Sequence, residues 1–329
     1  MVPTIRPATQ GDLTGITALL LRDAEQRRSA DPLLWRLPAD APARIAKAVD
    51  AALGKGLWHV AEREGRIVGV MHAMMVAVPP IYDGGAGHPG LFLDDCVTSA
   101  DALPGTADSL LVAAETALRA AGAPSLVASC PAAGPLRPLY ESHGYVPVTL
   151  YMAKHRFGRD ALPKAVKPAG PEDVPAIVTL SAAHRRSLAG LRPRFWYIHP
   201  DADSRFDAWM RRSLTFADRD MFVAGVTGVV RGYIIAQPCS RLLMPIAHEV
   251  AGLGVIDDFY DEDFADIAAV ANDGSSGAAL LAAAESAFAR RGVDSTLVVC
   301  PAAWSSKVSL LERNGYRLAK LWMAKQQDV

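Results

Sequence analysis

Residues 5–13 (IRPATQGDL) recur as residues 166–174 (VKPAGPEDV), and the fold follows from this recurrence. In both stretches an aspartate, Asp12 or Asp173, stands just before an apolar pattern of helical spacing. Later segments recur in the same order, with an offset that grows slowly from 161 to 171 positions: Asp94-Asp95 with Asp257-Asp258, Glu115 with Glu285, Cys130 with Cys300, and Tyr145 with Tyr316. Chance similarity between alanine-rich segments would not keep this order, so the chain consists of two copies of one domain.

The chain length agrees with two domains, because 329 residues are about twice the usual domain size. The periodic pattern breaks at residues 158–165, which include Pro163. We therefore predict an N-terminal domain over residues 1–157, a linker over 158–165 and a C-terminal domain over 166–329.

Composition narrows the class of protein. A hydrophobic fraction of 50% excludes general disorder. The formal net charge is −1 and no basic run interleaves with aromatic residues, so nucleic acid is not an expected partner. The four cysteines show no CxxC spacing, which argues against both a disulfide framework and a metal site. The apolar runs are too short for a membrane helix and the N-terminus lacks a signal peptide's apolar segment, so we expect a cytoplasmic protein.

Strands and helices alternate within each copy. In the first copy the patterns predict a strand at 5–7, a helix opening at Asp12, a second helix over 42–53 and a hairpin around 58–75. A strand over 90–97, a helix over 107–121, a buried strand over 125–129 and a short helix ending at 142 follow. Two last strands are expected around Val146 and Tyr151. This order predicts an α/β fold (α+β, with a mixed sheet) flanked by helices, present twice.

A loop of small residues precedes the main predicted helix of each copy. In the first copy the spaced positions are Val97, Ala102, Gly105, Ala107, Leu110, Leu111 and Glu115; in the second they are Asn272, Ser275, Gly277, Leu280, Leu281 and Glu285. This spacing resembles the signature Val-x-x-x-x-(Arg/Gln)-x-x-Gly-x-(Gly/Ala) of the GNAT family of acyl-CoA-dependent N-acetyltransferases. The resemblance covers nearly the whole chain and implies two tandem GNAT-like domains.

The resemblance implies acetyl-CoA as the co-substrate. Its diphosphate would be held by backbone N–H groups at the helix N-terminus, where the helix dipole is positive and small residues permit close approach. The pantetheine arm would pair with the strand ending at Val97, where that strand separates from residues 125–129. The residues implied for this binding are Val97, Ala102, Gly105, Thr106 and Ala107 in the first copy, and Ser275 and Gly277 in the second. Ala102 and Asn272 stand where the family has Arg or Gln.

Tyr140 is the candidate general acid. It lies in LYESHGY (residues 139–145), which matches the family's Leu-Tyr-x-x-x-Gly-(Phe/Tyr) ending, and the resemblance implies that it protonates the leaving thiolate. A phenol with a pKa of about 10 can donate to a thiolate whose conjugate acid titrates near 8.5, if the site desolvates the pair. A tyrosine packed on the sheet would explain Tyr140 equally well. The second copy has Leu311 at this position, so the first copy is predicted to be catalytic and the second degenerate.

An amine nucleophile must also lose a proton. Asp94 and Asp95 are adjacent in the predicted strand and would point to opposite faces, so one of them would face the acceptor. The pair 257–258 has the same property. We rank Asp95 first as the base, because the family often has an acidic residue two positions before the signature valine, here Val97. His72 is another candidate, and a purely structural role is as probable for each of these residues.

These features predict an acetyl-CoA-dependent N-acetyltransferase that acts by direct attack of a small-molecule or peptide amine. One alternative is a non-catalytic acyl-CoA-binding sensor or scaffold; another places the cofactor on the Gly-rich loop 274–277 of the second copy. Cys130 and Cys300 are expected in the core, and the aromatic run 195–199 is a candidate wall of an acceptor pocket. The sequence identifies neither the acceptor nor the oligomeric state, and it leaves a homodimer open.

Overall fold

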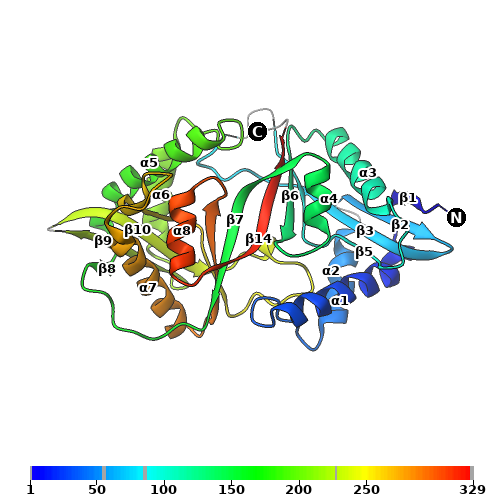
Figure 1. Cartoon of the computed structure of the whole chain (residues 1–329), viewed down its shortest axis with the longest axis horizontal. Helices are drawn as coiled ribbons and strands as arrows, with labels where there is room; N and C mark the ends of the chain where they lie inside the picture. Colours follow the sequence, from blue (N-terminus) through cyan, green and yellow to red (C-terminus); the bar gives the residue numbers. More distant parts are fainter. Residues whose placement is uncertain (1, 54–56, 84–86, 227, 327–329) are drawn as a thin grey trace.

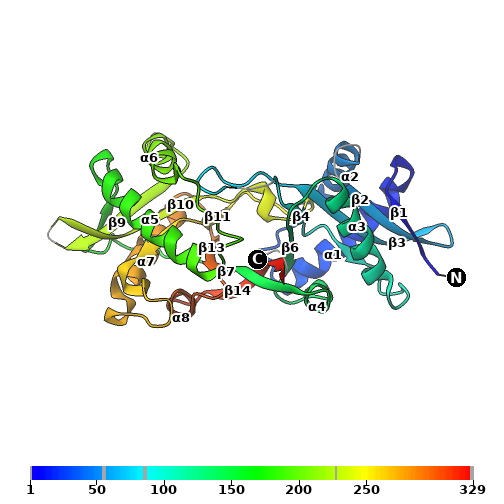
Figure 2. The ribbon, with the colours of Figure 1, turned by 90° about the horizontal axis from the view of Figure 1, so that it is seen from above.

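The computed structural model describes residues 2–53, 57–83, 87–226 and 228–326. Within these ranges fourteen strands form one mixed sheet that runs the length of the molecule, with helices packed along it (Figure 1). The first copy occupies one end of this sheet and the second copy the other end (Figure 1, Figure 2). The repeat in the sequence is therefore also a repeat in space.

The elements of the first copy follow the predicted order. They are β1 (Thr4–Pro7), α1 (Leu13–Ala30), α2 (Ala41–Ala52), β2 (Leu57–Arg63), β3 (Arg66–Met75), β4 (Gly90–Phe92), β5 (Val97–Thr98), α3 (Thr106–Ala120), β6 (Leu126–Pro131), α4 (Leu136–Ser142) and β7 (Tyr145–His155).

The second copy repeats this series element by element. It comprises β8 (Val166–Pro168), α5 (Val174–Leu191), α6 (Ala202–Ser213), β9 (Asp220–Val226), β10 (Val229–Pro238), β11 (Leu253–Ile256), β12 (Phe259–Asp261), α7 (Ser275–Arg290), β13 (Ser295–Pro301), α8 (Ser305–Arg313) and β14 (Arg317–Lys325).

The aspartate in the repeated opening stretch of each copy forms the same local contacts. The Asp12 carboxylate accepts the backbone N–H of Thr9 at 2.8 Å and forms an ion pair with Arg6 at 2.7 Å. Asp173 accepts the N–H of Gly170 at 2.9 Å in the same way and pairs with Lys167. The Arg6 guanidinium is the main cause that lowers the pKa of Asp12 to about 2. The aspartate thus ties the first strand to the start of the first helix in each copy.

Two predicted elements differ from the structure. The predicted strand 90–97 is interrupted after Phe92 and resumes only at Val97, so Asp94 and Asp95 lie in an irregular segment. The rule that neighbouring side chains alternate between faces does not apply to such a segment. At the end of the copy, the two predicted strands around Val146 and Tyr151 form the single continuous strand β7, which bends through pairing irregularities with β14 rather than through a turn.

The two copies exchange their last strands. Strand β14 of the second copy lies between β6 and β7, and β7 of the first copy lies between β14 and β13. All three of these neighbouring pairs are antiparallel. Each copy therefore completes the sheet of the other, and Figure 1 shows β7 and β14 together in the middle of the molecule.

Repeated residues hold this exchange in place. Lys154 of β7 pairs with Glu285 of the second copy at 2.7 Å, and Lys325 of β14 pairs with Glu115 of the first copy at 2.7 Å. These pairs are equivalent by the sequence repeat. The glutamate that the sequence places in each main helix therefore joins the two halves.

The core explains other repeated positions. Cys130 and Cys300 are each 0% exposed, which confirms their predicted place in the core. Helix α3 turns an apolar stripe to the sheet, formed by Leu110, Leu111, Ala114 and Leu118. Among the described residues, no helix is long and apolar enough to cross a membrane. Within the same ranges, His, Cys, Asp and Glu side chains form no group suited to hold a metal ion.

Candidate active site

A cavity of about 740 Å³ lies in the second copy, at the point where β11 and β13 separate. These two strands pair in parallel as far as Ile256 and Val298, and the cavity begins beyond that pair, between Asp257 and Val299. Helices α5 and α6 form one wall, and Lys307 of α8 lines the cavity from another element. Figure 2 shows α6 and α8 at opposite sides of these strands, so the cavity reaches through the opening in the sheet.

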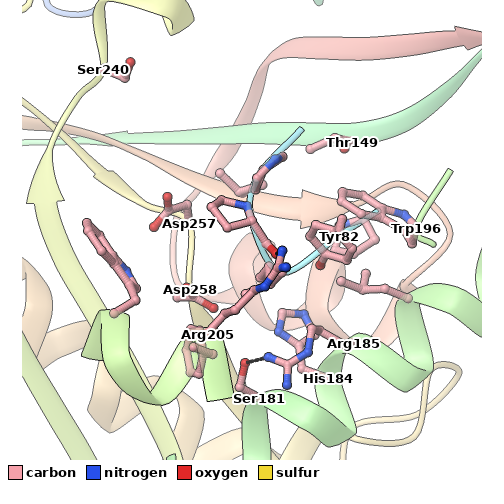
Figure 3. A pocket seen from close by; sticks show the side chains of 18 of the residues that line it. Tyr82, Thr149, Ser181, His184, Arg185, Trp196, Arg205, Ser240, Asp257 and Asp258 are labelled. Atoms are coloured by element: carbon pink, nitrogen blue, oxygen red, sulfur yellow. Dashed lines mark hydrogen bonds between the residues drawn. The ribbon is translucent and has the colours of Figure 1, made fainter. Parts of the chain in front are cut away.

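Both copies build this cavity. The segment after β3 of the first copy contributes residues 79–82, and a backbone bridge joins Tyr82 to Ile198 of the second copy. The exchanged strand β7 contributes Thr149 and Tyr151. Trp196, from the aromatic run that the sequence analysis considered as a pocket wall, also lines the cavity (Figure 3). The site thus depends on the strand exchange.

Two neighbouring carboxylates face the cavity (Figure 3). Asp257 accepts hydrogen bonds from the Gln237 side-chain amide at 2.9 and 3.0 Å, and Asp258 accepts one from the Tyr233 hydroxyl at 3.1 Å. Asp257 is an exposed residue of the cavity lining, and the surrounding protein partly desolvates its carboxylate. This desolvation, with the charge of Asp258 beside it, raises the pKa of Asp257 to about 7. Both side chains line one cavity rather than opposite faces, because they follow the end of β11.

The equivalent carboxylates of the first copy are enclosed. Asp94 is ion-paired with Lys320, whose side chain is fully buried, and it also accepts the Ser129 hydroxyl at 3.1 Å. Asp95, the predicted base, accepts the backbone N–H of Ile246 at 2.9 Å and lies 3.7 Å from His72 Nδ1. The two carboxylates are 2% and 4% exposed. The structure therefore brings Asp95 and His72 together, within a packed interior.

One pair of equivalent positions accounts for much of this difference. Lys320 on β14 corresponds to Thr149 on β7 by the repeat offset of 171 positions. Lys320 fills the first site with its side chain and neutralises Asp94, whereas the shorter, uncharged Thr149 lines the cavity of the second copy. Arg27 of α1 also occupies the first site, since its guanidinium donates to the Asp94 carbonyl at 2.8 Å. Its equivalent, Leu188, lines the cavity of the second copy.

Tyr140 lies inside the first copy's core. Its side chain is 0% exposed and tilts against Tyr145 with ring centroids 5.4 Å apart. The thiol of Cys96 is the polar side-chain group next to its hydroxyl. Burial, together with the neighbouring thiols of Cys96 and Cys130, raises the pKa of Tyr140 well above its ordinary value. Its equivalent, Leu311, is buried in the same way.

The N-terminus of α3 is open to solvent. Gly105 precedes the helix with φ of 81°, and a side chain at this position would meet no atom within 4 Å. No side chain caps the first turn. Thr106 is buried and Ala107 half-buried, while Val97 pairs with Val70 in the sheet and Ala102 packs against the core. Backbone N–H groups at such a turn fit a diphosphate, although Asp101 and Asp108 lie in the same segment.

The N-terminus of α7 is already occupied by protein carboxylates. Asp263 accepts the backbone N–H of Ser276 at 2.9 Å, and Asp261 accepts the Ser276 hydroxyl at 2.7 Å. Gly277 is buried, and a side chain there would come within 2.8 Å of Leu310. A carboxylate and a diphosphate compete for the same N–H groups, so this helix end does not fit the CoA diphosphate in the arrangement seen. Ser275 itself is exposed.

Several cavity residues were missed in the sequence, among them Thr149, Arg185, Lys307 and Trp322. Thr149 and Trp322 are Cα partners across β7 and β14. No local motif marks Thr149 and Trp322, because they come from the strands exchanged between copies. The signal available was the repeat itself, which aligns Thr149 with Lys320 and so exposes a change from a charged to a small side chain.

We compared the chain with known protein families, curated sequences and solved structures. No model of a known protein family matches the chain, and no curated protein sequence matches it. A GCN5-related N-acetyltransferase from Sphaerobacter thermophilus superposes with a TM-score of 0.54 and 16% identity, over 98% of this chain and 95% of that one. A GCN5-related glucosamine N-acetyltransferase region of a fungal multi-domain GH3 beta-N-acetylglucosaminidase gives a TM-score of 0.54 at 14% identity. That match covers 98% of this chain and 38% of the fungal one. The chain therefore has the fold of the GCN5-related N-acetyltransferases, the GNAT fold, in a tandem form.

Proposed function

We propose that this protein is an acetyl-CoA-dependent N-acetyltransferase whose acceptor amine binds in the cavity of the second copy. The observation that carries this proposal is the Asp257 carboxylate, which faces a cavity at the opening of the sheet. A general base works best when its pKa lies near the operating pH, because it can then both accept the proton and release it again. With a pKa of about 7, Asp257 suits that task near neutral pH.

The residues of this cavity have separable tasks in that reaction. Asp257 takes a proton from the amine as its nitrogen forms the C–N bond at the thioester carbonyl; the C–S bond then breaks, and CoA leaves as a thiolate to which Asp257 returns the proton. The side-chain amide of Gln237 donates to the Asp257 carboxylate at 2.9 Å and orients it. The Tyr233 hydroxyl orients Asp258 beside it. Acetyl-CoA supplies the acetyl thioester, and the opening in the sheet between Asp258 and Val299 is the route for its arm. Because α7 does not fit the diphosphate, we assign no role to that helix end.

The same reaction in the first copy would use Tyr140 and Asp95, as the sequence predicts. It would combine them with the open N-terminus of α3 for the diphosphate. We favour the second copy for the acceptor because Lys320 and the N–H of Ile246 already satisfy Asp94 and Asp95.

A second candidate is a binding protein that senses acyl-CoA. The specific observation in its favour is that the two copies divide the expected features. The first copy has the open helix end, and the second copy has the open cavity. In such a protein acetyl-CoA would bind at Ala107 without turnover.

Matched variants test both candidates. Thiol release from acetyl-CoA with a panel of amines is expected to fall at least about a hundredfold in Asp257→Asn, the usual scale for a general base. The variants Asp95→Asn and Tyr140→Phe examine the residues that the sequence predicts for catalysis in the first copy. If these lose turnover while Asp257→Asn keeps it, the reaction belongs to the first copy and our assignment fails.

Donor binding is measured separately by native mass spectrometry with acetyl-CoA. Ala107→Glu and Ser275→Glu each place a negative charge at one helix end, and Ala107→Gln and Ser275→Gln are their neutral controls. Loss of binding only in Ala107→Glu would place the diphosphate at α3, and loss only in Ser275→Glu at α7. Binding without turnover for any amine would favour the sensor, and no binding by the wild type would remove acetyl-CoA from the proposal.

A further inference from the structure

The cavity of the second copy gathers polar atoms that the protein leaves unpaired. Among the described residues, four buried side-chain atoms that have no hydrogen-bond partner belong to its lining: Thr149 Oγ1, His184 Nε2, Arg185 Nε and Trp322 Nε1. Buried polar groups in folded proteins are nearly always hydrogen-bonded. Neighbouring atoms shield each of these four atoms, which therefore make the cavity wall polar without facing the open space directly.

The unpaired atoms are mainly donors. The Arg185 and Trp322 atoms carry only N–H, and the Thr149 hydroxyl can donate. Burial lowers the pKa of His184 well below its ordinary value, so its ring is neutral. A set of donors matches a ligand that brings acceptor oxygens, such as a carboxylate.

Charge on the cavity wall gives the same indication. Arg185 is 2% exposed, and its terminal nitrogens already bond to Ser181 and Asp203. Arg205 donates to the Pro80 carbonyl at 3.0 Å, which brings its guanidinium to the loop that closes the cavity. Arg212 also lines the cavity. These three cations come from α5 and α6, and bidentate guanidinium contacts favour carboxylates.

The arginines and the carboxylates line adjoining parts of the cavity, and the charges of Lys307 and Arg185 both act on Asp258. In the view of Figure 3, Asp257 and Asp258 lie on one side and Arg185 on the other, with the Arg205 side chain between them. Large apolar side chains complete the wall, among them Tyr82, Trp196, Phe206, Trp209, Leu188 and Leu242. The cavity thus offers anionic, cationic and apolar contacts to a single molecule.

We propose that the acceptor is a free α-amino acid with a large apolar side chain. Its amino group lies at Asp257 and Asp258, its carboxylate at the arginines of α5 and α6, and its side chain against the aromatic wall. The volume of about 740 Å³ accommodates such a molecule together with an acyl group. This inference rests on the proposed N-acetyltransferase function and specifies its substrate.

The test uses the full chain without acetyl-CoA and three probes that differ by one group. L-phenylalanine carries both charges, 2-phenylethylamine lacks the carboxylate, and 3-phenylpropanoate lacks the amine. Isothermal titration calorimetry is expected to show L-phenylalanine binding at least about tenfold more tightly than either partial probe, because each lost charge-assisted contact is worth about a factor of ten.

Variants then assign each charge to its end of the ligand. Arg205→Gln should weaken L-phenylalanine and 3-phenylpropanoate about tenfold and leave 2-phenylethylamine unchanged. Asp257→Asn should weaken L-phenylalanine and 2-phenylethylamine and leave 3-phenylpropanoate unchanged. Arg211→Gln is the matched control, because Arg211 lies on the same helix but pairs with Asp207 at 2.8 Å outside the cavity lining. Arg185 is left intact, since its buried bonds make misfolding of a variant expected.

The outcomes separate this inference from the proposed function. The amino-acid assignment is wrong if 2-phenylethylamine binds as tightly as L-phenylalanine, or if no probe binds. It is also wrong if Arg205→Gln weakens the binding of L-phenylalanine and of 2-phenylethylamine equally. If amines without a carboxylate are acetylated with equal kcat/KM, the assignment is also wrong while the acetyltransferase function stands. If L-phenylalanine binds as expected but no amine is acetylated, the ligand class stands and the proposed function fails.

Discussion

Lys320 offers the most direct test of how the first copy's site is closed. Its ammonium is 0% exposed, is ion-paired with Asp94 and donates to the Leu243 carbonyl. Lys320→Met removes the cation and keeps most of the side-chain volume. Asp94 then retains the Ser129 hydroxyl at 3.1 Å as its side-chain partner and is left as a buried carboxylate without its ion-pair partner.

Breaking a buried ion pair by removing one partner costs about 3 to 5 kcal/mol of the free energy of unfolding. Because the sheet is continuous through both copies, we treat the 329 residues as one cooperative unit. The entropy of unfolding is then about 0.7 kcal/mol per degree. The expected fall in Tm is therefore about 4 to 7 °C, which differential scanning calorimetry resolves.

Two further variants make the reasoning refutable. The double variant Asp94→Asn with Lys320→Met removes both charges and should recover most of the lost Tm, because an uncharged pair can replace a buried ion pair at little cost. Arg211→Met breaks a solvent-exposed pair with Asp207 and should change Tm by less than about 1 °C. If Lys320→Met leaves Tm unchanged, or if the double variant is no more stable than the single one, the buried pair does not have the role assigned to it.

Three other measurements follow from the structure. The kcat/KM for the acceptor should rise as pH increases through about 7, because Asp257 must be deprotonated to accept a proton, and Asp257→Asn should abolish this rise; a flat wild-type profile would contradict the assignment. Burial lowers the pKa of His248 from 6.5 to about 4, so the unfolded chain binds the proton first as pH falls. From pH 7 to 5 the wild type should lose about 2 kcal/mol relative to His248→Gln in urea unfolding, and a pH-independent difference would exclude this. Trp304→Phe removes one of two donors to the buried Phe264 carbonyl, the indole N–H at 2.8 Å, and leaves the Ser306 hydroxyl at 3.2 Å. We therefore expect a loss of about 0.5 to 1.5 kcal/mol by thermal unfolding, and an unchanged stability would show that the Ser306 bond alone satisfies this carbonyl.

The internal repeat made much of the fold predictable. It determined the element order of each copy, and the small residues before α3 and α7 indicated the GNAT fold that the structural comparison supports. These predictions succeeded because they depend on local contacts. Asp12 and Asp173 form hydrogen bonds at the start of the first helix with residues only three to six positions away. Cys130 and Cys300 were assigned to the core on residue type alone, and the structure agrees.

The predictions for the site depended on contacts that no local pattern contains. The sequence analysis predicted one strand over residues 90–97, whereas the structure has β4 and β5 with a break between them. Asp94 and Asp95 do not disturb the hydrophobic pattern visibly, so the sequence did not indicate this break. Tyr140 and Asp95 remain predictions for catalysis, and the structure places both in a packed interior. The cavity lies instead in the copy that has Leu311 at the tyrosine position.

The sequence by itself determined that there are two similar domains of this fold, because a repeat and its helical spacing are written in neighbouring residues. Only the tertiary structure decided which copy keeps an open site. That outcome depends on the exchange of β7 and β14, which puts Thr149 in the cavity wall of the second copy and Lys320 onto Asp94, a contact between residues 226 positions apart. The physical reason is that one buried ammonium fills and neutralises the first site, whereas a threonine in the equivalent place does neither.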